Sequence, residues 1–277
     1  MALQDNKFLD RSEIASITYH DIFGYPLSTK DIIKWRVGKK GLFLFKNLKE
    51  VLNIDGLYFI KGKENLLYKK ALGERVSVRK MEIAKKCASI LSKFSSIKGV
   101  FITGALAMNN AKDEGDIDLM IITKRNNLWT TRMFAYLALK IMNFDIRKPN
   151  DKNQIDKLCL NIWLDESALS WNKNDRNIYS AHEIAQIVPI INKDNIYQRF
   201  LFKNNWILGY WPNSVRIEDI RHEGKKITNI SNLFERVAYL IQYKYMKSKI
   251  TKEKVGLHKG IFHPRSWKEN VLQKLST

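Results

Sequence analysis

The stretch that decides the fold is GALAMNNAKDEGDID, which covers residues 104–118. It follows an apolar run at residues 99–103 and leads into another at residues 119–123. Apolar runs of this length, separated by a glycine turn, predict two strands of a buried sheet. Asp116 and Asp118 stand two residues apart at the start of the second strand. Because side chains alternate along a strand, both carboxylates are expected on one face.

Two carboxylates side by side repel each other, and burying them without a partner is costly. A hard divalent cation such as Mg2+ or Mn2+, carrying substrate phosphates, would balance their charge. Gly104 lets the backbone approach such a ligand closely. A short helix over residues 106–110, which includes Asn109, would point its free N–H groups at the same anion. Acid pairs on exposed strand ends are merely solvated, so the buried setting is what favours a metal site here.

This segment resembles the DNA polymerase β-like nucleotidyltransferase superfamily, whose signature is an apolar residue, Gly and Ser, followed at a set interval by Asp-apolar-Asp-apolar. Here ten residues separate Ala105 from Asp116. More widely, residues 19–27 and 181–186 resemble uncharacterised prokaryotic proteins that carry such a domain. The resemblance implies an α/β (α+β) fold with a small mixed sheet flanked by helices. It also implies Mg2+-dependent transfer of a nucleoside monophosphate from a nucleoside triphosphate to an acceptor hydroxyl. The residues implied to hold metal are Asp116 and Asp118, and those implied to bind nucleotide are Gly104, Ala105, Asn109 and Arg132.

Two departures from the family pattern bear on activity. Ala105 replaces the serine that offers a hydroxyl to the phosphates. The third carboxylate of the family is expected on a later strand, where residues 157–164 carry Asn161 as their central polar residue. Asp165 is the alternative, with the same strand parity but about 13 Å further along. A buried Asn bonded to backbone is a third interpretation. A second hypothesis is therefore a regulatory module that binds nucleotide or nucleic acid without turnover.

Residues 1–73 are predicted to form a winged-helix-like module. Helices are expected over residues 10–23, 28–37 and 44–52, followed by a hairpin over residues 56–63 and 65–68. In a DNA-binding winged helix the third helix would contact DNA. The alternative is a winged helix used only for packing or protein contacts. The lysines expected to face DNA are Lys46, Lys49, Lys61 and Lys63.

Residues 74–190 are predicted to form the nucleotidyltransferase-like domain, beginning with a long helix over residues 74–94. One face of this helix is apolar and carries Met81, Ala84, Cys87, Ala88 and Leu91. A later helix over residues 128–143 places Arg132 in its first turn, where it would reach a nucleotide or remain solvated. His182 and Glu183 are adjacent on a helix without a second histidine one turn away, so a structural pair is favoured over a zinc site.

Residues 191–277 are predicted to form a basic, mostly helical region. A helix over residues 232–249 carries one apolar stripe. Aromatic residues in this region would either stack on exposed bases or belong to the core. The stripe consists of Phe234, Val237, Ala238, Ile241 and Tyr245, and the aromatic residues are Trp206, Tyr210, Trp211 and Trp267.

The net charge is +20, divided as +7 in residues 1–80, +3 in residues 81–190 and +10 in residues 191–277. A basic periphery suits a polyanionic partner, so nucleic acid is a candidate beside the nucleotide. Cys87 and Cys159 lie in apolar patterns and are expected to be reduced core thiols. The N-terminal residues lack an apolar signal core, and no membrane partner is expected. The protein is therefore expected in the cytoplasm.

Overall fold

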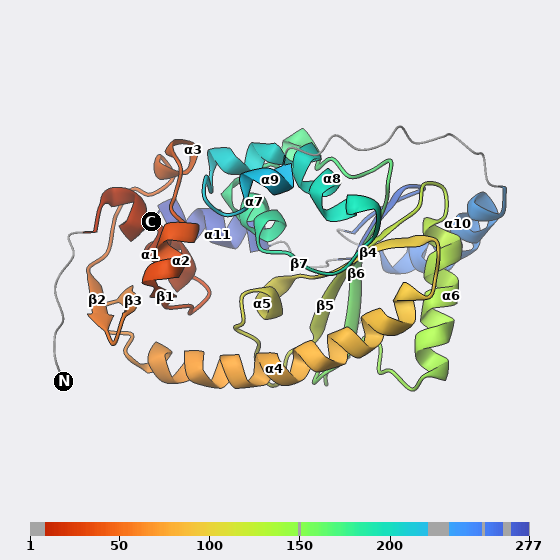
Figure 1. Cartoon of the computed structure of the whole chain (residues 1–277), viewed down its shortest axis with the longest axis horizontal. Helices are drawn as coiled ribbons and strands as arrows, with labels where there is room; N and C mark the ends of the chain where they lie inside the picture. Colours follow the sequence, from red (N-terminus) through yellow and green to blue (C-terminus); the bar gives the residue numbers. More distant parts are fainter. Residues whose placement is uncertain (1–8, 149–150, 221–232, 251–252, 263–266, 277) are drawn as a thin grey trace.

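The computed structural model describes residues 9–148, 151–220, 233–250, 253–262 and 267–276. It confirms the predicted mixed α/β class, with one six-stranded mixed sheet and one small antiparallel sheet. Figure 1 shows the small sheet at one end of the molecule, and the long helix α4 running from it along one side of the large sheet. Helices α7, α8 and α9 lie on the opposite side of that sheet.

The N-terminal part alternates short helices with a three-stranded sheet in the order β1-β3-β2. Its first helix begins with a capping box, in which Asp10 accepts from the backbone of Glu13 and the Glu13 side chain accepts in return. Ser28 and Asp31 form the same motif at the second helix, as the hydroxyl at Ser28 predicts. The elements are α1 (Arg11–Asp21), β1 (Leu27–Ser28), α2 (Thr29–Lys34), α3 (Lys39–Leu42), β2 (Val51–Ile54) and β3 (Leu57–Ile60).

Two predicted elements of this part were wrong. The third helix spans only Lys39–Leu42, and the segment predicted as a helix over residues 44–52 leads into strand β2 instead. The hairpin is formed by β2 and β3 around Asp55 and Gly56, which both have positive φ. Such a turn suits the right-handed twist of the two strands. Residues 65–68, predicted as a strand, form the first turn of α4.

Helix α4 (Asn65–Ser92) links the N-terminal part to the large sheet. The predicted helix over residues 74–94 is confirmed, but it begins nine residues earlier, at Asn65. The residues predicted to face the sheet do so, because Ala84, Cys87, Ala88 and Leu91 are fully buried. One continuous helix therefore crosses the expected boundary between residues 73 and 74.

The large sheet has the order β7-β4-β5-β6-β9-β8. Only β5 and β6 pair in parallel, whereas the other four neighbouring pairs are antiparallel. The predicted strand pair around the acids is thus β4 and β5, joined through the short helix α5. The strands are β4 (Ile97–Ile102), β5 (Ile117–Thr123), β6 (Leu158–Asp165), β7 (Val188–Asn192), β8 (Lys254–Gly256) and β9 (Lys259–Ile261).

Each face of the large sheet has its own hydrophobic core. Ile117, Leu119 and Ile121 pack with α4 and α6 on one face. Met120 and Ile122 pack on the other face with α7, α8 and the N-terminal helices. This second core joins residues from all three segments expected from the sequence. The helices that surround the sheet are α5 (Gly104–Ala107), α6 (Leu128–Ile141), α7 (Ile178–Ala185), α8 (Ile196–Lys203) and α9 (Ile217–Ile220).

The C-terminal region is less purely helical than predicted, because β8 and β9 extend the large sheet from β6. Its helices are α10 (Leu233–Met246) and α11 (Trp267–Ser276). Most of the predicted apolar stripe of α10 faces outward, since Phe234 is 81% exposed and Tyr245 is 72% exposed, whereas Ala238 is buried. Trp211 is fully buried in the core, which favours packing over base stacking for this residue. Among the described residues, no helix is long and apolar enough to span a bilayer.

Candidate active site

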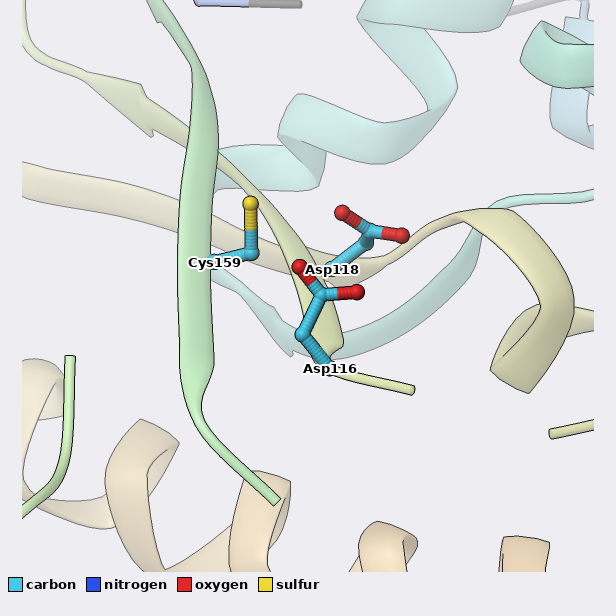
Figure 2. A group of neighbouring side chains, drawn as sticks. All are labelled: Asp116, Asp118 and Cys159. Carbon is cyan, nitrogen blue, oxygen red and sulfur yellow. The ribbon is translucent and has the colours of Figure 1, made fainter. Parts of the chain in front are cut away.

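The two predicted acids lie together at the start of β5. Asp116 precedes the strand, Asp118 is its second residue, and Cys159 of β6 faces them (Figure 2). One oxygen of each carboxylate and the Cys159 sulfur all lie within 4.8 Å of one another. The close approach of the two carboxylates agrees with their spacing in the sequence. Cys159 was expected in the core instead, and only Cys87 fits that expectation.

An irregular register between β5 and β6 decides which polar residue of β6 reaches the acids. Asp118 pairs with Cys159, but Met120 pairs with Ile162, so β6 contains one extra residue between these pairs. Asn161 lies within this irregularity and donates its amide N–H to Asp118 Oδ1 at 2.6 Å. The structure therefore places Asn161 beside the acids, with its side-chain amide bonded to a carboxylate.

Asp165 lies at the opposite end of β6 and pairs with Thr123. The extra residue in β6 reverses the strand parity, so Asp165 and Asp118 belong to different faces of the sheet. Its oxygens accept hydrogen bonds from Ser167 at 2.5 Å and from His258 at 2.8 Å. The prediction that Asp165 and Asn161 lie on the same face of the sheet was thus wrong. Asp165 forms its hydrogen bonds with Ser167 and His258 instead.

Gly104 holds the backbone turn directly against Asp118. Its φ is +62°, and a Cβ added to it would lie 2.6 Å from Asp118 Oδ2. Glycine is required here both for the backbone conformation and for space. The Asp118 carboxylate thus lies directly against the backbone of the turn. Ala105 is exposed on this turn, and Asn109 closes it with a positive φ of 55°.

Arg147 forms an ion pair with one of the two acids. Its Nη1 lies 2.6 Å from Asp116 Oδ2 and 3.7 Å from Cys159 Sγ. The Asp116 side chain is 13% exposed and that of Arg147 is 28% exposed. One guanidinium thus faces two acids, which leaves negative charge in the cluster. Arg147 was not singled out from the sequence, because it lies 29 residues beyond Asp118 in a segment without a recognisable motif.

Lys80 holds the two loops that lead into β5 and β6. It is fully buried on α4, and its ammonium group donates to the Gly115 carbonyl at 2.6 Å and to Asp156 at 2.8 Å. Each bond fixes one of the loops, so α4 sets the position of Asp116 relative to β6. The sequence shows Lys80 only as one lysine of a basic helix, and its burial could not be predicted.

Burial, and then the negative charge of Asp116, raises the pKa of Asp118 to about 7. The pKa of Glu183 on α7 is raised to about 8 by burial and then by the charge of Asp118. Glu183 is thus a third carboxylate in the field of the acids. It was expected to have a structural role only. A cation beside these groups would stabilise their charged forms.

Arg132 takes a place that neither sequence interpretation foresaw. Its guanidinium donates to Gln242 of α10 at 2.6 Å and lies over the rings of Tyr136 and Phe262. The half-buried side chain therefore packs against α6, α10 and Phe262 and not against the acids. A role in nucleotide binding stays a prediction.

His182 supports the expected structural role. Its Nε2 lies 3.1 Å from Nε2 of His20, and both rings are at least 96% buried. The His20 Nδ1–H donates to the Ser16 carbonyl, so its Nε2 accepts the N–H of His182 in a neutral pair. Trp35 packs against His182 with ring centroids 4.2 Å apart. The two sequence phrases at residues 19–27 and 181–186 thus meet in the core.

Among known protein families, residues 85–176 match the model described as polymerase beta, nucleotidyltransferase. This part of the chain is a nucleotidyltransferase domain of the polymerase beta family. The domain includes the Gly104 turn, both acids and Asn161. Membership of this family indicates transferase activity and a nucleotide substrate, and such domains typically use a divalent metal. Searches of curated proteins and of solved structures gave no significant match.

The residues of the cluster are suitable ligands for a divalent cation. It offers two carboxylates, which are preferred ligands of Mg2+ and Mn2+, and the amide of Asn161 adjoins them. Arg147 balances only one of the two negative charges. Gly104 brings the backbone of the turn against the same carboxylate, so a phosphate bound by that backbone would lie beside the cation.

Proposed function

We propose that this protein is a Mg2+-dependent nucleotidyltransferase that moves a nucleoside monophosphate from a nucleoside triphosphate to an acceptor hydroxyl. The observation that carries the proposal is the acid pair beside the Gly104 turn, where the half-buried Asp118 meets a backbone without a side chain. Asp116 and Asp118 would hold the metal. When bound, Mg2+ or Mn2+ supplies charge that stabilises the transferring phosphoryl group.

The protein residues position the reactants around that charge. Asn161 donates to Asp118 Oδ1, which fixes the orientation of this carboxylate. The backbone N–H groups of the Gly104 turn would bind the triphosphate in place of the serine hydroxyl that is missing at Ala105. The acceptor oxygen forms a bond to the α-phosphorus as the bond to pyrophosphate breaks, and the hydroxyl proton passes to a carboxylate of the site.

The Asp118→Asn substitution tests this assignment. It removes the charge that holds the metal, so Mg2+-dependent incorporation of labelled nucleotide into pooled RNA and protein acceptors should fall at least about 1,000-fold. Loss of a buried charge should leave the melting temperature unchanged or higher, which separates lost chemistry from lost folding. Transfer at the parental rate by Asp118→Asn would show the assignment to be wrong.

A second candidate is a module that binds nucleotide but does not turn it over. Ala105 and Asn161, which replace a serine and a carboxylate of the family, favour it. This candidate predicts metal-dependent nucleotide binding without incorporation in the parent chain. Transfer that appears only in the Ala105→Ser and Asn161→Asp double variant would support it. Metal-dependent incorporation by the parent chain would exclude it.

DNA binding by the N-terminal module has weaker support. Three of the four lysines expected to contact phosphates are engaged in ion pairs. Lys63 lies 2.6 Å and Lys49 3.8 Å from Asp21, and Lys61 lies 2.8 Å from Glu50. The helix that would contact DNA has only four residues, Lys39–Leu42. The order of helices and strands is compatible with a winged helix, and its use for protein contacts stays a prediction.

A further inference from the structure

We propose that Arg147 and a divalent cation compete for Asp116, and that the displaced Arg147 then binds the triphosphate of the nucleotide. The inference rests on the proposed function, because it concerns the same acid pair. It assigns to Arg147 two alternating partners, a carboxylate and a phosphate. Both are oxyanions that a guanidinium binds well.

The first argument is the position of the guanidinium. Arg147 Nη1 contacts Asp116 Oδ2 at 2.6 Å and Cys159 Sγ at 3.7 Å. It thus touches two of the three groups whose ligand atoms lie within 4.8 Å of one another. A cation bound by those atoms would lie about 2–2.6 Å from its oxygen ligands. It would therefore stand next to Nη1, and the two positive charges repel at this distance.

The second argument is that Arg147 can leave Asp116 without leaving the site. Its backbone N–H donates to the Leu158 carbonyl at 2.9 Å, and Leu158 in turn donates to the Asp145 carbonyl at 2.8 Å. These bonds fix the backbone of Arg147 beside the start of β6. The side chain is 28% exposed, so its guanidinium can rotate toward solvent while the core packing stays intact.

The third argument is electrostatic balance. An arginine remains protonated throughout the physiological pH range, so it cannot leave Asp116 by losing its proton. A divalent cation brings twice its charge and can displace it. The freed guanidinium has five N–H donors in a planar fork, which matches the oxygens of a triphosphate. When the cation displaces Arg147 from Asp116, the guanidinium therefore becomes available beside the metal to bind the phosphates of the nucleotide.

Titration calorimetry with Mn2+ alone tests the competition on the full chain. Arg147→Gln should bind Mn2+ about tenfold more tightly than the parent, because the competing charge is gone. Arg147→Lys should lie between them, since a point charge pairs less well with a carboxylate. Arg36→Gln is the matched control, because Arg36 also pairs with acids, Asp10 and Glu13, but outside this site. It should leave Mn2+ affinity unchanged.

A second titration tests the phosphate role. In saturating Ca2+, Arg147→Gln should bind a non-hydrolysable nucleoside triphosphate about tenfold more weakly than the parent. The two effects of this one substitution thus have opposite signs, which a general loss of folding cannot produce. Mn2+ affinity that is equal or weaker in Arg147→Gln would overturn the competition. Unchanged triphosphate affinity would overturn the phosphate role.

Asp118→Asn separates this inference from the proposed function. If Asp118→Asn abolishes Mn2+ binding while Arg147→Gln fails to strengthen it, the metal site stands and the competition is refuted. If Asp118→Asn binds Mn2+ like the parent, the metal assignment itself is refuted, and the competition with it.

Discussion

Two polar clusters in this protein differ in how their charges are balanced and in how far solvent reaches them. The histidine pair, His20 and His182, is neutral, almost fully buried and enclosed by aromatic rings. The acid pair, Asp116 and Asp118, is partly exposed and carries more negative charge than Arg147 balances. A structural cluster satisfies its members internally, whereas a functional cluster leaves charge for a ligand. Charge balance and access distinguish the two, and the presence of polar residues does not.

The largest expected effect on stability concerns the histidine pair. His182→Ala removes a ring packed on Trp35 and leaves the Nε2 of His20 without its donor. The free energy of unfolding should fall by about 3–5 kcal/mol, the range for a large buried side chain that also loses a hydrogen bond. Urea denaturation measures this change. Nucleotide transfer per folded molecule should be retained. A His182→Ala variant as stable as the parent but without transfer activity would show that the histidine pair is functional and not structural.

Acid pH should act on the two clusters in opposite directions. Burial lowers the pKa of His20 to about 4, below its ordinary value of 6.5, so this residue stabilises the fold above pH 6.5. As pH falls from 6.5 to 4 the unfolded chain takes up the proton first, and about 3 kcal/mol of stability is lost. Asp118, whose pKa is raised from 3.8 to about 7, takes up its proton first in the folded state, so it adds stability throughout this range.

The contribution of Asp118 to the pH dependence of stability is measurable by urea denaturation of the parent and of Asp118→Asn between pH 8 and pH 4. The parent should lose less stability, because Asp118 offsets part of the histidine effect. Parallel curves for the two proteins would show that Asp118 has no raised pKa.

The smallest expected effect distinguishes the two ends of β6. Asn161→Ala removes the amide donor to Asp118, so transfer should fall about tenfold, which corresponds to about 1.4 kcal/mol. Asp165→Asn is the matched control at the far end of the strand. It should lower the melting temperature, because Asp165 accepts from Ser167 and His258, but leave transfer unchanged. If Asp165→Asn lowered transfer and Asn161→Ala did not, Asp165 and not Asn161 would be the residue that supports transfer.

Local patterns predicted those features that depend on near neighbours. Period-two alternation placed Asp116 and Asp118 together, the apolar runs located β4 and β5, and the glycine before the acids marked the turn at Gly104. The helix before β4 was also predicted, together with its buried face. The prediction of a third helix over residues 44–52 was wrong, because residues 51–54 pair with β3 and form a strand. Helical periodicity in a short apolar segment cannot exclude such pairing.

Features that depend on distant contacts escaped prediction. One extra residue in β6 put Asp165 on the other face, and a register shift between strands leaves no mark in a single sequence. The burial of Lys80 and the exposed stripe of α10 likewise depend on which surfaces meet. Cys159 and Arg147 reach the acids only because β6 and the segment before it lie beside β5.

The sequence by itself determined the acid pair, its glycine turn and the family of the domain, because these depend on spacing along one short segment. Only the tertiary structure decided what surrounds the acids. Asn161, Arg147 and Glu183 come from three elements, and their approach results from strand register, sheet order and the packing of α7. Chain spacing fixes which groups share a strand face, whereas charge balance depends on what folds against that face.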